Sequence, residues 1–131
     1  MNAANMANVY KQQQIMTASP EELTLMLYNG AIRFVNESIQ AIESKDLEKA
    51  HKSNMRAQDI VHELMITTDM SYEISKNWLV LEEYIMHCLI QGNIKKDVEM
   101  LQQAKKMLTE FRDTWVQAIK IVRQQKAAGG E

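Results

Sequence analysis

Residues 17–30 read TASPEELTLMLYNG, and this stretch decides how the chain folds. Ser19 is a residue type whose side-chain oxygen caps the free amides of a first helical turn, and Pro20 suits the first helical position. Glu22 stands where a capping box places an acidic residue. The stretch therefore predicts a helix that begins at Ser19, and the apolar pattern after it extends this helix to about residue 43.

This predicted helix is apolar over more than half of its circumference. A helix that is buried on one side needs an apolar stripe about 100° wide, whereas the apolar residues here span roughly 200° on a helical wheel. They are Leu23, Leu25, Leu27, Tyr28, Ala31, Ile32, Phe34, Val35 and Ile39. A helix with so wide an apolar surface is expected to pack against several other elements.

Three further helices are indicated by apolar residues at intervals of three and four. The second begins near Asp46 or Leu47 and ends in the turn-like TTDMS of residues 67–71. Its stripe is Leu47, Ala50, Ala57, Val61 and Leu64. The third begins near Ser71 and stops at Gly92-Asn93, a typical helix end. Its main stripe is Ile74, Trp78, Leu81, Ile85 and Cys88.

The fourth helix begins around Asp97 and has the most regular pattern. Its stripe is Leu101, Ala104, Leu108, Phe111, Trp115, Ala118 and Val122. Four glycines and one proline are too few for an all-β chain. We therefore predict an all-α fold, an antiparallel four-helix bundle over residues 17–125, because short connections make successive helices antiparallel neighbours.

Two terminal segments lie outside the predicted bundle. Residues 1–16 are interpreted as a flexible N-terminal arm whose first eight or so residues are disordered and which can form a short cap helix. Residues 126–131 are interpreted as a disordered tail.

Composition excludes several classes of function. The 131 residues include 15 basic and 17 acidic side chains, a net charge of -2 that gives no general attraction to nucleic acid or to an anionic membrane. The N-terminal residues lack a signal-peptide pattern, and no apolar run approaches the length of about 18 residues that a membrane span needs. One cysteine cannot form an internal disulfide, so we expect a cytosolic protein with no membrane insertion.

Catalytic and metal-binding patterns are weak. Glu48-x-x-His51 matches the pair found in di-iron helical bundles, but those sites need a second such pair, which the sequence lacks. His62 is eleven residues from His51, about 16 Å along a helix, too far to share a metal. Cys88 lies on a predicted core stripe and is interpreted as a buried structural thiol. We predict no catalytic residue, metal or cofactor, and a di-metal bundle enzyme is the least favoured alternative.

Basic residues of the second helix give no nucleic-acid site. They are Lys45, Lys49, Lys52 and Arg56, and Asp46, Glu48 and Asp59 are interleaved with them. Such mixed charge is typical of a solvated face with ion pairs.

Additional apolar stripes indicate a surface for a partner. On the third helix, Leu79, Met86 and Ile90 cluster away from the main stripe, with Glu82 between the two stripes. Met55 and Ile66 form a smaller stripe on the second helix. Because a simple bundle needs one buried stripe per helix, these residues are either covered by the chain itself or form a groove for another chain. Ten methionines fit an adaptable binding surface or a core with irregular gaps.

The segment before the bundle, VYKQQQIM, carries isolated apolar points at Val9, Tyr10, Ile15 and Met16. It is too short to be a stable independent helix. It is either a frayed arm or a cover that lies over the groove until a tighter ligand displaces it.

Several of these stretches resemble the flagellar secretion chaperone FliS family. The resemblance includes Tyr10, the TASP run, Glu22-Leu23-Thr24 and MLYNGA at residues 26–31. It continues with LEEYIM at 81–86, Gly92-Asn93 with Asp97, and FRDTW at 111–115, so that it covers about residues 8–123. The chain has Asn29 where related sequences often have aspartate, and Gly92 where alanine is common. The first difference can alter a local hydrogen bond, and the second should sharpen the end of the helix.

The resemblance implies a cytosolic helical chaperone that binds the C-terminal segment of newly made flagellin. Such a chaperone prevents premature polymerisation and aids delivery to the flagellar type III export apparatus. Tyr10, Ile15 and Met16 are then expected to form the covering arm, and Met55, Ile66, Leu79, Met86 and Ile90 to contact the partner.

An export-gate component, an anti-sigma factor and, when the chain is free, a second copy of itself are further candidate partners. The sequence does not choose among them. Since an apolar groove does not name its ligand, a regulatory adaptor for a different amphipathic partner is the alternative function.

Overall fold

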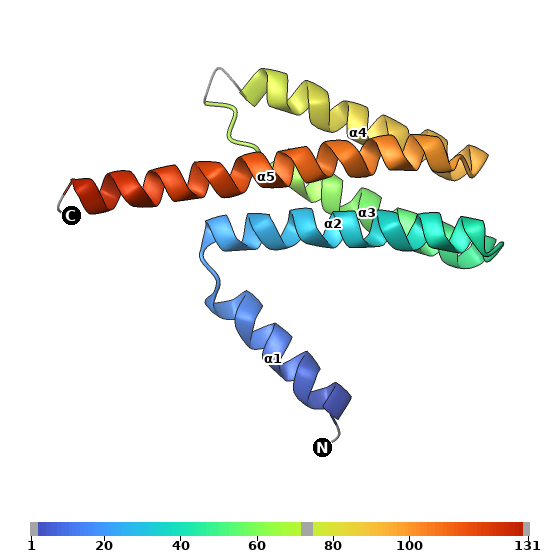
Figure 1. The fold of residues 1–131 in the computed structure, drawn as a ribbon, viewed down its shortest axis with the longest axis horizontal. Helices are drawn as coiled ribbons and strands as arrows, with labels where there is room; N and C mark the ends of the chain where they lie inside the picture. The colour runs from blue at the N-terminus through green and yellow to red at the C-terminus, as the bar shows by residue number, and fades with distance from the viewer. Residues whose placement is uncertain (1–2, 72–74, 130–131) are drawn as a thin grey trace.

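The computed structural model describes residues 3–71 and 75–129, and all regular secondary structure in these two ranges is α-helical (Figure 1). The helices are α1 (Ala3–Thr17), α2 (Pro20–Glu43), α3 (Leu47–Thr67), α4 (Ser75–Lys95) and α5 (Val98–Ala128). The prediction of an all-α fold is confirmed. No helix in the described ranges combines the length and the apolar character that a membrane crossing requires.

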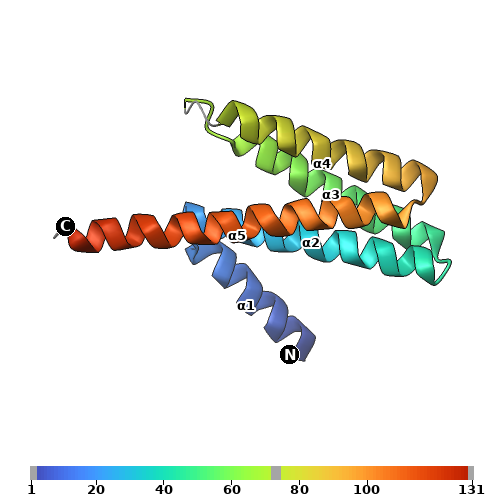
Figure 2. The same ribbon diagram turned by 45° about the horizontal axis from the view of Figure 1, so that its top comes forward.

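Helices α2 to α5 pack as a ring in which α2 contacts α3 and α5, and α4 contacts the same two helices. Successive helices of the ring run in opposite directions (Figures 1 and 2). The α2–α3 and α4–α5 turns therefore lie at one end, called the closed end below. The open end is the opposite one, where α2 and α4 begin and α3 ends. Helix α1 projects away from the ring in both views.

The start of α2 is built as the sequence predicts. The Ser19 hydroxyl oxygen accepts a hydrogen bond from the Glu22 amide at 3.2 Å, and Pro20 is the first helical residue. The wide apolar surface of α2 is covered by α3 on one side and α5 on the other. The guanidinium groups of Arg33 and Arg56 cover the Phe34 ring, 4.7 and 5.4 Å from its centroid, in cation–π geometry.

Two turns with the same backbone conformation connect the helices at the closed end of the ring. Lys45 and Lys96 follow the ends of α2 and α4 with φ angles of 63° and 50°, the left-handed conformation of a Schellman helix end. After each lysine, the amide of Asp46 or Asp97 donates to the carbonyl five residues earlier, at 2.8 and 2.9 Å. The same aspartates then cap α3 and α5.

We expect Lys45→Gly to stabilise the protein, because glycine adopts the left-handed conformation without the side-chain clash that other residues have. The gain in the free energy of unfolding should be roughly 0.5 to 1 kcal/mol, after the greater entropy of unfolded glycine is deducted. Urea unfolding followed by circular dichroism measures it.

Lys96→Gly is the matched comparison. The Lys96 ammonium donates to the carbonyl and the side-chain oxygen of Asn93, both at 2.8 Å, and glycine loses both bonds. An equal gain at the two positions would contradict this account of the turns.

Gly92 differs from its predicted role. We expected it to help stop the helix, but α4 continues to Lys95, and Gly92 is buried within it. A Cβ atom at this position would lie 2.6 Å from Leu101 Cδ2, so that a larger residue could not fit without a shift of the Leu101 side chain or of α5. Glycine is needed here for the close approach of α4 to α5.

Gly92→Ala is therefore expected to lower the free energy of unfolding by about 1 to 3 kcal/mol, the usual cost of overpacking a core. Gly30→Ala is the control, because a Cβ there would meet only Ile60 Cδ1 at 3.3 Å. Thermal unfolding of the two variants measures the difference. A Gly92→Ala protein as stable as the Gly30→Ala protein would rule out tight packing at this point.

The predicted core stripes need three corrections. Leu47, placed on the second stripe, is 53% exposed because it is the first residue of α3. Leu81 is 42% exposed, and its neighbour Glu82 takes the inward position at 2%. The fourth stripe is buried only as far as Phe111; Val122 is 49% exposed because α5 extends past the ring. Ile74 lies outside the described residues.

Buried polar groups at the closed end are hydrogen-bonded. The Ser38 hydroxyl donates to the Ala50 carbonyl at 2.8 Å and joins α2 to α3. The Asn54 amide nitrogen donates to the Leu89 carbonyl at 3.2 Å and joins α3 to α4. Small and satisfied residues thus let the helices approach closely at this end.

Candidate partner-binding site

A cavity of about 360 Å³ lies at the open end of the ring, and all four of its helices contribute to its lining. Several lining residues are exposed, among them Thr67, Asp69 and Thr114, so the cavity opens to solvent. The full lining is Thr24, Tyr28, Leu64, Thr67, Thr68, Asp69, Ser75, Trp78, Glu82, Thr114, Trp115 and Ala118. A cavity with aromatic walls and a few polar groups is the usual form of a binding site.

Two tryptophans line this cavity and are held by defined contacts. Trp78 of α4 stacks on Phe111 of α5, with ring centroids 4.2 Å apart and planes inclined by 26°. The indole N–H of Trp115 donates to the Glu21 carbonyl in the first turn of α2 at 3.0 Å. Both side chains are half-buried, so each contributes to the core and to the cavity surface.

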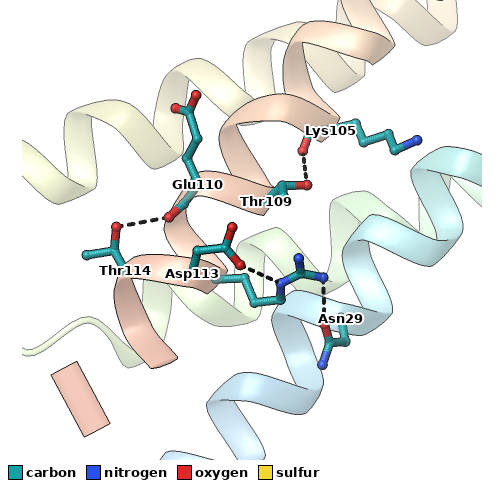
Figure 3. Close-up of polar contacts among 7 residues, drawn as sticks. Asn29, Lys105, Thr109, Glu110, Asp113 and Thr114 are labelled. Atoms are coloured by element: carbon teal, nitrogen blue, oxygen red, sulfur yellow. Dashed lines mark hydrogen bonds and ion pairs between the residues drawn. The ribbon is translucent and has the colours of Figure 1, made fainter. Parts of the chain in front are cut away.

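Polar contacts along α5 hold it to α2 near the cavity (Figure 3). The Arg112 guanidinium donates to Asn29 Oδ1 of α2 and to Asp113 Oδ1, each at 3.2 Å. Thr114, at the cavity rim, donates its hydroxyl to the Glu110 carbonyl at 2.9 Å. Asn29 thus takes part in the local hydrogen bond that its difference from related sequences was expected to affect.

The connection between α3 and α4 forms another part of the rim. The Ser75 hydroxyl donates to the Asp69 carbonyl, which ties this connection to the first turn of α4. The Ser71 amide donates to Asp69 Oδ1 at 2.9 Å. Hydrogen bonding from Ser71 lowers the pKa of Asp69, so this carboxyl is ionised at neutral pH.

Glu82 is the polar group that the sequence pattern did not locate. It was expected to separate two apolar stripes on the helix surface, but its residue is only 2% exposed. Its Oε1 lies 2.8 Å from the Thr68 hydroxyl, whereas Oε2 is buried without a hydrogen-bond partner among the described residues. Buried polar atoms are nearly always paired, so an orphaned carboxyl oxygen beside a cavity is unusual.

The Thr68 hydroxyl cannot donate a second hydrogen bond to Glu82 Oε2. It also lies 3.0 Å from the Leu64 carbonyl, and one hydroxyl hydrogen serves one acceptor at a time. Burial raises the pKa of the Glu82 carboxyl, and the bond with Thr68 only partly opposes this. Burial also raises the pKa of the neighbouring Tyr28 to about 12, so its phenol stays neutral at physiological pH.

Glu82→Gln should raise stability at neutral pH and flatten its pH dependence. The folded-state pKa of Glu82 lies above its unfolded value, near 4.5, so the folded protein binds the proton more tightly. The free energy of unfolding therefore falls as the pH rises from 4.5 through the folded-state pKa. Glutamine does not titrate, and we expect a gain of the order of 1 kcal/mol at neutral pH.

Urea unfolding of both proteins at a series of pH values between 4 and 8 tests this expectation. Glu83→Gln is the control, because Glu83 is adjacent on α4 but exposed. Parallel stability curves for wild type and Glu82→Gln would contradict the assignment of a raised pKa to Glu82.

The residues predicted to form the N-terminal cover lie on α1. Tyr10 is 62% exposed and Met16 85% exposed, and the Ile15 side chain lies outside what is described. None of the seven predicted contact residues with a described side chain lines the cavity. Helix α1 joins α2 at the open end but projects away from the ring (Figure 1).

The other predicted contact residues lie on two neighbouring helices. Met55 and Ile66 are on α3 and are 39% and 63% exposed, and Ile90 on α4 is 38% exposed. Leu79 is half-buried, and Met86 packs partly against the core. Met86 is therefore shared between the core and the surface.

The possible metal ligands are used in other contacts. Glu48 forms an ion pair with Lys52 at 3.0 Å, and His51 Nδ1 lies 2.9 Å from the Asn93 amide nitrogen. Within residues 3–71 and 75–129, no three His, Cys, Asp or Glu side chains are grouped to hold a metal ion. Cys88 is buried with a free thiol, as the core stripe predicted.

The cavity residues were missed for an identifiable reason. Trp78 and Trp115 were recognised only as members of core stripes, although both stand where their stripes approach the open end. Thr68 and Glu82 carry no apolar signal at all, and a charged residue is normally assigned to the outside of a helix.

The fold and cavity define a helical binding protein, and comparison with known proteins identifies its family. Residues 2–122 match the family model of the flagellar protein FliS. A flagellar secretion chaperone FliS of Bacillus subtilis is 38% identical over 130 residues, which cover 99% of this chain and 98% of that protein. A Salmonella typhimurium protein of the same name is 24% identical over 114 residues, covering 85% and 84% of the two chains.

This chain therefore belongs to the FliS family of flagellar secretion chaperones. The family is one of chaperones and not of enzymes. The matched region includes α1, α2, α3 and α4 and continues along α5 as far as residue 122.

Proposed function

We propose that this chain is a cytosolic export chaperone for flagellin. It binds the C-terminal segment of newly made flagellin, prevents premature polymerisation and aids delivery to the flagellar type III export apparatus. We class the ring of α2 to α5 as an antiparallel four-helix bundle that presents the binding surface. Family membership supports the export role, and the surface of α4 supports the capture of an apolar segment.

The observation that carries the proposal is the apolar character of both faces of α4. Its inner face buries Ile85, Cys88 and Leu89. Large apolar residues are also exposed along the same helix: Val80, Leu81, Tyr84, Ile90 and Ile94. A helix in a self-sufficient monomer needs one apolar face, so a second one on α4 favours a partner that covers it.

The proposed contacts extend from α4 to α3 and to the cavity. Ile90 and Met86 of α4, with Leu79, supply one side, and Met55 and Ile66 of α3 supply the other. Methionine side chains adapt to the shape of a partner at low cost. An extended and partly helical segment laid over these helices would reach the open end, where the aromatic cavity is available.

We further propose that α1 acts as a displaceable cover through Tyr10, Ile15 and Met16. Helix α1 joins the bundle beside the cavity, and its exposed Met16 has a large apolar area to bury. Because α1 projects away from the ring in this structure, covering requires it to fold back over the surface, from which flagellin then displaces it. Such a cover protects an apolar surface from unspecific association.

The proposed mechanism works by occupancy. A flagellin segment that is disordered in the monomer would fold against the chaperone and bury the apolar face that it otherwise uses for assembly. Ordering such a segment costs conformational entropy, so a large contact surface is needed for useful affinity. No nucleotide and no covalent step are required.

We expect the chain to form a stable 1:1 complex with a C-terminal flagellin peptide, and the peptide to gain helicity. Ile66→Asp and Ile90→Asp should each weaken the affinity about tenfold or more, because an aspartate buried against an apolar segment lacks a partner. Light scattering after gel filtration gives the stoichiometry, circular dichroism gives the helicity, and calorimetry gives the affinity.

Ile121→Asp is the matched control, since Ile121 is also exposed but lies on α5, outside the proposed contact surface on α3 and α4. Each variant must retain wild-type helicity. No complex with wild type at tens of micromolar peptide would reject flagellin capture. Equal affinities for all three variants would instead reject the proposed contact surface on α3 and α4.

A further inference from the structure

The cavity at the open end has a chemical preference that an apolar groove alone would not have. One buried carboxyl oxygen, Glu82 Oε2, faces no donor among the described residues although its residue is almost completely enclosed. If Glu82 is ionised, Oε2 needs a donor. If Glu82 is protonated on Oε2, Oε1 still accepts from Thr68 and the Oε2 hydroxyl needs an acceptor instead. A missing donor is therefore a property of the ionised carboxylate, and a cation placed at Oε2 favours that ionised state.

The surroundings of Glu82 favour a cationic donor. Among the residues that the structure describes, the charged ones that line the cavity are Glu82 and Asp69, both acidic, and no lysine, arginine or histidine is among them. Trp78, Trp115 and Tyr28 supply aromatic faces, which attract a cation through their quadrupoles. An anion would meet two carboxyl groups, which outweigh the partial positive charge at the α4 N-terminus beside Ser75.

We propose that this cavity receives a single lysine or arginine side chain of the bound partner segment, with its cationic group on Glu82 Oε2 and its aliphatic stem between Trp78 and Trp115. The inference rests on the proposed function, because it assigns one anchoring position within the captured segment. It adds charge specificity to a contact surface that is otherwise apolar.

The assignment also explains why a destabilising carboxyl occupies the interior. An unpaired buried carboxyl oxygen lowers the stability of the free protein. A cation that enters the cavity would form a hydrogen bond with this oxygen, and removal of the unfavourable state would strengthen binding. A long side chain with an apolar stem and a charged end fits a cavity whose walls are aromatic and whose floor is acidic.

Small-molecule probes test the cavity without flagellin. n-Butylguanidinium and n-butylammonium imitate the two side chains, and n-butylurea is a neutral compound of similar shape that also donates hydrogen bonds. The readout is the indole N–H signals of Trp78 and Trp115 in NMR titrations, assigned with Trp115→Phe. We expect the two cations to bind about tenfold more tightly than n-butylurea.

Glu82→Gln should abolish this preference, and Glu83→Gln should leave it intact. Equal binding of n-butylurea and the cations would overturn the proposal, as would a preference that Glu82→Gln leaves unchanged or the absence of any shift at Trp78. Retained helicity of both variants excludes unfolding as the cause of a lost preference.

Flagellin peptides then separate this inference from the proposed function. Each basic residue of a C-terminal flagellin peptide is replaced in turn by norleucine, and affinities for wild type and Glu82→Gln are compared. One replacement should weaken binding about tenfold to wild type but not to Glu82→Gln. A peptide that binds with no such coupled residue overturns the inference and leaves the function standing. A peptide that does not bind, while n-butylguanidinium does, rejects flagellin capture and leaves the cation site standing.

Discussion

The close approach of α4 to α5 at Gly92 is the constraint on which the rest of the structure depends. The absent Cβ leaves room for Leu101, which is completely buried, and this contact brings the second helical hairpin into a tight turn. At the same end, Ser38 and Asn54 satisfy the carbonyls of neighbouring helices. Because this end is tightly packed and the buried Ser38 and Asn54 side chains are hydrogen-bonded, the opposite end can remain hollow without loss of the fold.

The open end has features that are unfavourable in a helical bundle without a partner. Two tryptophans and a tyrosine line a cavity, and a buried glutamate has one oxygen that finds no donor in the described part of the chain. Nearby, α4 exposes a second apolar face. These features cost stability in the free chain and fit a protein whose surface is completed by a partner, as the proposed chaperone function requires.

Helix starts were predicted well from the sequence, the buried face of α4 was predicted less well, and the cavity was not predicted. Three helix starts followed from local chemistry, because Ser19, Asp46 and Asp97 cap the helices that were expected after them, whereas the helix end expected at Gly92 was wrong. The inward face of α4 was misassigned by one residue, since Leu81 has the hydrophobicity of a core residue and Glu82 does not. The cavity could not be predicted, because it depends on where the ends of α2, α3 and α4 stand relative to one another and to α5.

The sequence by itself determined the helical class, the capped start of α2 and the family, because these depend on neighbouring residues and on a pattern that extends along the chain. Only the tertiary structure decided that Glu82 points inward and that Gly92 serves packing against Leu101 and does not end its helix. It also decided that Trp78 and Trp115 share one cavity. Those features arise from contacts between residues far apart in the sequence, and hydrophobic periodicity within one helix carries no information about them.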